Sequence, residues 1–190
     1  MAFEINTDFL ENLVGFIYEK NDSEIKKIFS EIHFADIAEV LDEVTFDEAI
    51  YIIKLLDSEK TSEILTELDE DTREKILENL SAKEIANEVG EMDSDDAADI
   101  IGELSEERQK HVIKALNDDE LVADIKELLS YEDNTAGSLM AKELVKVYET
   151  WTVAGCMRRI RGQAKEVTRV HSIYVVDNND KLKGRLSLKD

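Results

Sequence analysis

A period of twelve residues runs from Asn21 to Leu128, and it restricts the fold more than any other feature of the sequence. Cutting the chain every twelve residues from Asn21 gives nine units whose ninth and twelfth positions are all apolar. The ninth positions are Phe29, Leu41, Ile53, Leu65, Leu77, Val89, Ile101, Ile113 and Ile125. The twelfth positions are Ile32, Val44, Leu56, Leu68, Leu80, Met92, Leu104, Leu116 and Leu128. Such a period is typical of similar elements stacked on one continuous core.

The first position of each unit carries a residue that begins helices. Eight of the nine are Asn, Thr, Asp or Ser, whose side chains accept hydrogen bonds from the free N–H groups of a first helical turn, and the exception is His33. Thr45 with Glu48 and Ser81 with Glu84 also have the spacing of a capping box. Each unit is therefore predicted to be a cap, about two turns of helix and a tight corner.

Helices this short are marginal alone and must bury their apolar stripe against neighbours. After a first helix near Asp8–Glu19, the sequence therefore predicts a mainly α fold, a superhelix or α-solenoid of short helices. Glu88 and Asp124 occupy the eighth position, where the other units carry Val or Ile. These two acids indicate a local break in packing or an edge.

The charge changes sign along the chain. Residues 1–134 hold 39 acids and 12 bases, a net charge of −27, whereas residues 135–190 hold 6 acids and 11 bases, a net charge of +5, which together give −22. The shift predicts a boundary between an acidic helical-repeat domain, residues 1–130, and a C-terminal part, residues 131–190. A field this negative repels phosphate, so nucleic acid is excluded as the main partner, and cations or a basic protein surface are attracted.

The C-terminal part has an α/β pattern. Strands are expected over 144–148, 172–177 and 181–188, with a helix from Val153 to about Arg161 and a turn over 177–180. The helix is predicted to bury one face, which places Cys156 in the core. That face is formed by Val153, Cys156, Met157 and Ile160. One helix on three strands is too thin to close a core, so this part is expected to be truncated or completed by a partner.

The sequence contains no catalytic constellation. There is no Gly-rich phosphate loop, and no histidine has a Cys or His neighbour at zinc spacing, so the chain is not expected to be an enzyme. No apolar run approaches the ~18 residues of a membrane span. The acids near residue 95 are partly explained by helix-start chemistry, with Asp93 as the cap and Asp95 and Asp96 in the first turn. Only Asp99 lies further along the helix.

Three segments together resemble the MgtE-type magnesium transporters. They are Glu91–Asp99 (EMDSDDAAD), Tyr131–Met140 (YEDNTAGSLM), and Ile173–Asp177 followed by Leu182–Asp190. The last of these is similar to the β-hairpin of any CBS (cystathionine-β-synthase-like) domain. The resemblance covers nearly the whole chain. It implies an N-terminal acidic superhelix followed by a partial first CBS domain, with a second CBS domain and a membrane pore outside the sequence.

The same resemblance implies a cytosolic Mg²⁺-sensing region at the cytoplasmic face of the cell membrane. Bound Mg²⁺ would hold the superhelix against the CBS domains and favour the closed pore. The implied partners are Mg²⁺, the second CBS domain and the transmembrane pore, with a homodimer at full length. The implied metal ligands are Asp95, Asp99, Glu63, Asp96 and the backbone carbonyl of Ser138. Because other ligands would lie beyond the end of this sequence, weak Mg²⁺ binding is expected.

Two other interpretations remain open at this point. The repeat is also compatible with a protein-interaction solenoid that needs no metal. The C-terminal part is compatible with a CBS-type nucleotide sensor, because Arg158, Arg159 and Arg161 form a basic cluster that could contact a nucleotide. The same arginines also fit a solvated helix end.

Overall fold

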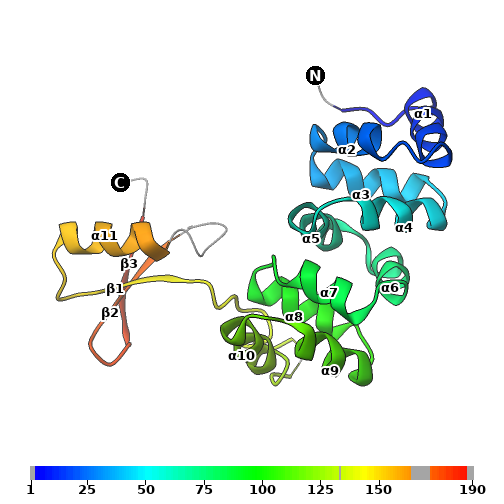
Figure 1. Cartoon of the computed structure of the whole chain (residues 1–190). Helices are drawn as coiled ribbons and strands as arrows, with labels where there is room; N and C mark the ends of the chain where they lie inside the picture. The colour runs from blue at the N-terminus through cyan, green and yellow to red at the C-terminus, as the bar shows by residue number, and fades with distance from the viewer. Residues whose placement is uncertain (1–2, 133, 164–171, 188–190) are drawn as a thin grey trace. The chain divides into compact units, whose positions relative to one another are not determined.

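The computed structural model of the chain describes residues 3–132, 134–163 and 172–187. Its elements follow in the order α1–α10, β1, α11, β2 and β3 (Figure 1). The chain divides into two compact units. The first unit comprises Met1–Met92 and Asp96–Ala123, and the second comprises Asp93–Asp95 and Asp124–Asp190.

The repeat forms short helices in step with the twelve-residue period. They are α1 (Thr7–Tyr18), α2 (Asp22–Ser30), α3 (Phe34–Glu43), α4 (Phe46–Leu55), α5 (Ser58–Glu67), α6 (Glu70–Glu78), α7 (Ala82–Val89), α8 (Ser94–Gly102), α9 (Glu106–Ala115) and α10 (Asp119–Leu128). Helices α2 to α9 each begin at the second residue of a unit, directly after the capping position. Alternate helices pack together, α3 with α5, α5 with α7 and α7 with α9. The predicted fold, stacked short helices followed by a small α/β part, is confirmed.

Local capping chemistry sets the helix starts. In both predicted capping boxes the carboxylate of the third helical residue accepts the N–H of the cap, Glu48 that of Thr45 at 2.8 Å and Glu84 that of Ser81 at 2.7 Å. His33, the exception in the capping column, also caps its helix, because its Nδ1 accepts the N–H of Ala35 at 3.3 Å.

The last repeat helix starts one residue later than its column predicts. Asp118, and not Asn117, receives the free N–H groups, from Glu120 at 2.8 Å and from Leu121 at 3.1 Å. One carboxylate oxygen that accepts two N–H groups satisfies more of the first turn than a single bond does. Helix α10 therefore begins at Asp119.

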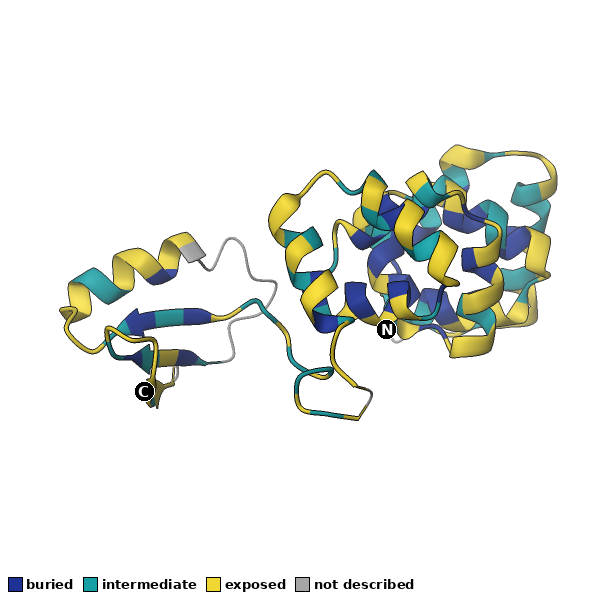
Figure 2. Ribbon diagram, turned by 90° about the horizontal axis from the view of Figure 1, so that it is seen from below, coloured by how far each residue is buried: buried dark blue, intermediate teal, exposed yellow. Residues whose placement is uncertain are grey.

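The apolar stripes of the repeat helices are buried, and Figure 2 draws buried residues in dark blue. The ninth residue of every unit is buried except Ile113, which is half-buried. Thr61 on α5 is an unusual member of this core, because its side chain is fully buried. Its Oγ1 has no hydrogen-bond partner among the described residues.

Three basic side chains cap the C-terminal ends of other helices. In each case the acceptors are the backbone carbonyls of the ninth and twelfth residues of a unit, which a helix end leaves without partners. A cation there also interacts favourably with the helix dipole. The pairs are Lys60 to Phe29 and Ile32, Arg73 to Leu65 and Leu68, and Arg108 to Leu77 and Leu80.

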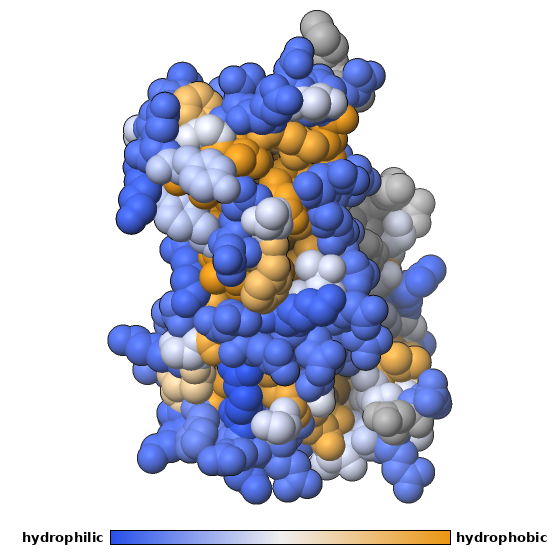
Figure 3. Space-filling model, turned by 90° about the vertical axis from the view of Figure 1, so that its right-hand side faces the viewer, coloured by the Kyte–Doolittle hydropathy of each residue, from blue (hydrophilic) through white to orange (hydrophobic). Residues whose placement is uncertain are grey.

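The surface of the molecule is mostly hydrophilic on the face shown in Figure 3, as the acidic composition requires. An apolar area lies near the N-terminal end of that face. The exposed apolar side chains of the first unit include Tyr18 at the end of α1, 80% exposed, and Phe46 at the start of α4.

The second unit carries a three-stranded sheet in the order β1-β2-β3. Strand β1 (Val145–Tyr148) is parallel to β2 (Ile173–Val176), and β2 is antiparallel to β3 (Leu182–Leu186). Helix α11 (Val153–Gln163) connects β1 to β2 along the chain, and Thr152 directly before it accepts the N–H of Gly155 with its Oγ1 at 3.2 Å. The small core between this sheet and α11 consists of Val145, Val147, Ile160 and Ile173, with Cys156 and Val175 packed against it.

One part of the predicted helix face is wrong. Ile160 is buried and Cys156 is half-buried, but Val153 is 81% exposed and Met157 is 43% exposed. The sheet is only three strands wide over the described residues, so it covers part of the apolar stripe and leaves the rest open.

Candidate functional site: the acidic start of α8

Helix α8 presents three of the predicted metal ligands. Its apolar side chains, among them Ala97, Ala98, Ile100 and Ile101, are buried. Asp96 and Asp99 are exposed and Asp95 is half-buried, so the carboxylates lie on the outer side of the helix. Asp95 and Asp99 are spaced i, i+4, which puts one above the other on a single helix face.

These acids belong to a wider electrostatic network. Asp96 and Asp99, like Asp93 before the helix, each interact with another group of the chain. Arg73 makes a bidentate pair with Glu103, with Nη2 2.5 Å from Oε1. The bond to Glu103 raises the pKa of Arg73, and the charges of Glu103 and Asp99 add to that effect. Asp99 therefore lies in the field of a fixed guanidinium group.

The N-terminus of α8 is capped from a distant part of the chain. Ser94 is fully buried, and both its N–H and its hydroxyl donate to the carboxylate of Glu143, each at 2.9 Å. The hydroxyl oxygen in turn accepts the N–H of Lys142 at 3.0 Å. The ammonium group of Lys142 pairs with Glu127 of α10 at 2.5 Å. This pairing raises the pKa of Lys142 and lowers that of Glu127.

Glu63 lies on α5, away from the α8 acids along the repeat. Its exposed carboxylate lines a groove of about 320 Å³ together with Asp57, Glu59 and Lys60. The ammonium group of Lys60 is engaged with the carbonyls at the end of α2, so it does not serve as a free counter-charge for this groove. No residue of α8 lines the groove.

Ser138 lies in a turn of the segment between α10 and β1. Its N–H donates to Thr135 Oγ1 at 3.3 Å, and its hydroxyl donates to the Thr135 carbonyl at 3.0 Å. The neighbouring Gly137 is pressed against Tyr131, so a Cβ there would lie 2.5 Å from the ring. The Tyr131–Gly137 part of the motif is thus explained by packing, and the Ser138 carbonyl remains a predicted ligand.

The structure thus places Asp95, Asp96 and Asp99 on one helix and Glu63 and Ser138 on other segments. Among the described residues, no three His, Cys, Asp or Glu side chains gather closely enough to hold a metal ion. The contact of Ser94 with Glu143 was not predictable from a local sequence pattern, because it spans 49 positions.

A second electrostatic feature lies where α5 packs on α7. Glu88 is half-buried and its Oε2 is enclosed without a hydrogen-bond partner among the described residues. Burial raises its pKa to about 7, the charges of Asp57, Glu84 and Glu91 add to the rise, and a hydrogen bond with Ser58 opposes it. A carboxylate is thus enclosed at this apolar position of the repeat, while α7 still packs on α5 and α9.

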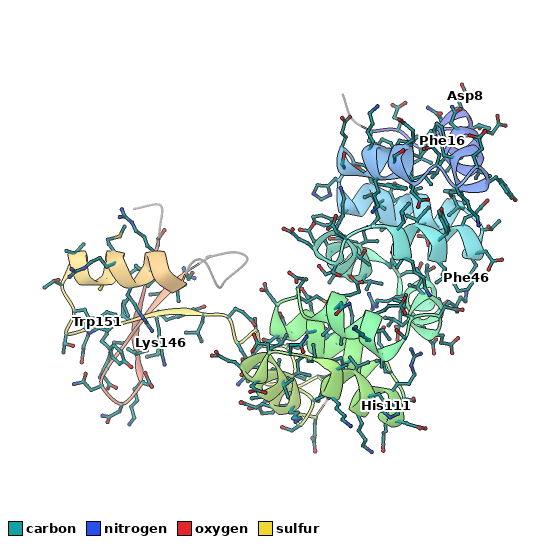
Figure 4. All side chains as sticks on the ribbon, viewed as in Figure 1. Asp8, Phe16, Phe46, His111, Lys146 and Trp151 are labelled. Carbon is teal, nitrogen blue, oxygen red and sulfur yellow. The ribbon has the colours of Figure 1, made fainter. Side chains whose placement is uncertain are left out.

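The histidines and the basic cluster do not form a reaction centre in the described part of the chain. His33 caps α3, His111 is exposed on α9 (Figure 4), and His171 lies outside the described residues. Arg158 and Arg159 are exposed and line an open groove of about 540 Å³ with Trp151. Lys146, also labelled in Figure 4, pairs with Asp180 at 3.2 Å.

The comparisons with known proteins agree with this arrangement. The family model of the MgtE intracellular N domain matches residues 32–134, and that of the CBS domain matches residues 136–190. The chain belongs to the MgtE family. The N-domain match covers the acidic repeat from the end of α2 onwards, and the CBS match covers β1 to β3.

Curated relatives include the magnesium transporters MgtE of Enterococcus faecalis, 41% identical over 71 residues, and of Thermus thermophilus, 43% identical over 68 residues. These matches cover 37% and 36% of this chain but only 16% and 15% of the two transporters. The MgtE chain described here therefore matches a small part of the length of these relatives. Among its described residues, no helix is both long and apolar enough to span a bilayer.

Two solved structures share the fold over 95% of this chain. The soluble part of a magnesium transporter has a TM-score of 0.80 at 24% identity, and 71% of that chain is covered. The cytosolic domain of the Mg²⁺ channel MgtE in complex with ATP has a TM-score of 0.85 at 28% identity, and 73% of that chain is covered.

Proposed function

We propose that this MgtE chain is the Mg²⁺-sensing regulatory region of a magnesium transporter. Mg²⁺ ions bound between the acidic superhelix and the CBS domains favour the closed state of the pore. The observation that carries the proposal is the Asp95–Asp99 pair, two carboxylates one helical turn apart on the outer side of α8. Family membership supports it, because the curated relatives are magnesium transporters.

The chemistry of Mg²⁺ suits such a surface. Mg²⁺ prefers oxygen ligands, keeps several of its waters and needs only one or two carboxylates from each partner. In the described part of the chain, no three possible ligands cluster together. This is compatible with Mg²⁺ ions whose remaining ligands come from a second protein surface. Residues 1–134 carry a net charge of −27, and without bound cations these negative charges repel one another. The docked state therefore loosens when the Mg²⁺ concentration falls.

The proposal extends to partners and location. The remaining ligands come from the CBS region and from groups outside this sequence, and the partners are a second CBS domain and a transmembrane pore. The full-length protein is a homodimer at the cytoplasmic face of the cell membrane. Its role is regulatory rather than enzymatic.

Calorimetric titration of the full-length protein with MgCl₂ tests the proposal. Asp95→Asn combined with Asp99→Asn should weaken Mg²⁺ binding at least tenfold. The matched control is Glu70→Gln with Glu74→Gln, which removes the same two charges at the same i, i+4 spacing from the exposed side of α6. Equal affinities for the wild type and the α8 double variant would reject Asp95 and Asp99 as ligands.

Nucleotide sensing is a second candidate, favoured by the MgtE relative that was solved in complex with ATP. The net charge of +5 over residues 135–190 suits a phosphate-bearing ligand. Titration with ATP, with and without MgCl₂, distinguishes the two functions. Binding of ATP that is independent of Mg²⁺ supports a nucleotide sensor, and binding of neither ligand favours a metal-independent interaction scaffold.

A further inference from the structure

The start of α8 receives a hydrogen-bond partner from a distant part of the chain. Helices α4, α5, α6 and α7 take their caps from the residue directly before them. Helix α8 offers its first N–H and the Ser94 hydroxyl to Glu143, a residue of the segment that leads into β1. We call the contact of Ser94 with Lys142 and Glu143 the α8 clasp.

The α8 clasp is centred on the buried Ser94, and Lys142 and Glu143 are half-buried. Ser94 has no exposed surface, and its hydroxyl both donates to Glu143 Oε2 and accepts from the Lys142 N–H. Hydrogen bonds that involve an ionised carboxylate are stronger than neutral ones. The pair of Lys142 with Glu127 fastens the same segment to the end of α10.

The clasp also has an electrostatic cost. The carboxylate of Glu143 lies at the N-terminus of α8, and Asp95 and Asp96 are in the first turn of the same helix. The helix N-terminus attracts each of these anions, but like charges at close range repel one another. A cation held by the neighbouring aspartates would lower that repulsion, so cation binding and a closed clasp should favour each other.

We propose that Glu143 is a positioning residue that couples the aspartates of α8 to the segment leading into the CBS domain. Through the α8 clasp, Mg²⁺ at Asp95 and Asp99 tightens residues 134–144 onto the start of α8, and an open clasp weakens Mg²⁺ binding. This inference rests on the proposed function.

Limited chymotrypsin cleavage of the full-length protein, measured against MgCl₂ concentration, is the test. Leu139, 74% exposed, is a cleavage site within the clasped segment, and Tyr131, 39% exposed, is a site just before it. Glu143→Gln should raise the Mg²⁺ concentration for half-maximal protection roughly 5- to 20-fold, which lies in the lower part of the range of typical couplings between two sites. Ser94→Ala should do the same, and the double variant should add little to either, because both remove one contact.

Further variants and measurements distinguish an effect of the position of the Glu143 carboxylate from an effect of charge or of misfolding. Glu132→Gln removes an exposed charge just before that segment and should shift the midpoint less than twofold. Glu143→Asp keeps the charge but withdraws it by one methylene, so it should behave like Glu143→Gln. Thermal unfolding without Mg²⁺ shows whether each variant is folded, and amide hydrogen exchange at Ser94 reports the clasp directly.

The outcomes are distinct. A wild type that responds to MgCl₂, with folded Glu143→Gln and Ser94→Ala variants whose midpoints stay within twofold of it, overturns the positioning role and leaves the proposed function standing. A wild type whose cleavage does not respond to MgCl₂ overturns the proposed function, and the inference falls with it.

Discussion

Replacing Glu88 by Gln should stabilise the acidic repeat at alkaline pH and leave it almost unchanged at acidic pH. Glu88 occupies an apolar position of the repeat, and its Oε2 is enclosed between α5 and α7 without a hydrogen-bond partner among the described residues. Gln has nearly the same shape and carries no charge, so it imitates the protonated carboxyl. The change therefore isolates the cost of burying the ionised form.

The magnitude follows from the pKa. Burial raises the pKa of Glu88 from 4.5 to about 7, so the folded repeat holds a proton that the unfolded chain releases. A difference of about 2.5 corresponds to about 3 kcal/mol at 1.36 kcal/mol per pKa unit. Because solvent reaches part of the side chain, screening reduces this to about 1.5 kcal/mol.

The sign sets the pH window. Below pH 4.5 Glu88 is protonated in both states and contributes no penalty. Between pH 4.5 and about 7 the folded state binds more protons than the unfolded state, so this residue lowers the free energy of unfolding as pH rises. Above about pH 7 the full penalty is present.

Thermal unfolding by circular dichroism at pH 5 and pH 8 measures the effect. Glu88→Gln should raise the Tm by about 5 °C at pH 8 and by about 1 °C at pH 5, relative to the wild type at the same pH. Glu84→Gln on the same helix is the control, because its capping-box bonds to Ser81 lower the pKa of Glu84 and its loss should destabilise the repeat at pH 8. Equal Tm gains for Glu88→Gln at both pH values would refute the reasoning.

Three further substitutions test the packing. Arg108→Met leaves the carbonyls at the end of α6 unpaired and should cost about 2 kcal/mol in urea unfolding, whereas Lys110→Met on the same helix should cost less than about 0.5 kcal/mol. Thr61→Val removes a buried hydroxyl without a described partner and should raise the unfolding free energy by about 1 kcal/mol; a loss instead would reveal a partner for Oγ1. Gly137→Ala should lower the Tm by several degrees, equivalent to about 2 kcal/mol, because its Cβ meets Tyr131, and a Tyr131→Ala background should remove the loss.

The sequence predicted best what depends on neighbouring residues. Helix starts were predictable because a cap and its N–H partners lie within three positions, as in Thr45 with Glu48. The exception at Asn117 arose because the next residue, Asp118, can accept two N–H groups. Where several capping residues are adjacent, composition alone does not choose between them.

Packing between residues far apart in the chain could not be predicted from the sequence. Val153 and Met157 fit the apolar face of α11, but which part of that face is covered depends on the width of the sheet. The α8 clasp joins Ser94 and Glu143, which nothing in a local pattern connects. The predicted Mg²⁺ ligands came from a family resemblance, and they stay predictions because the described residues bring no three of the acids together.

The basic side chains that cap helix ends should affect how the repeat unfolds. In a simple solenoid each repeat touches only its neighbours, and the array can melt unit by unit from its ends. Here Lys60 on α5 holds the end of α2, and Arg108 on α9 holds the end of α6, three units earlier in each case. Loss of one helix thus leaves unpaired carbonyls well beyond the adjacent unit. The acidic repeat should therefore unfold in larger cooperative blocks, and truncation at a repeat boundary should destabilise helices that the cut does not touch.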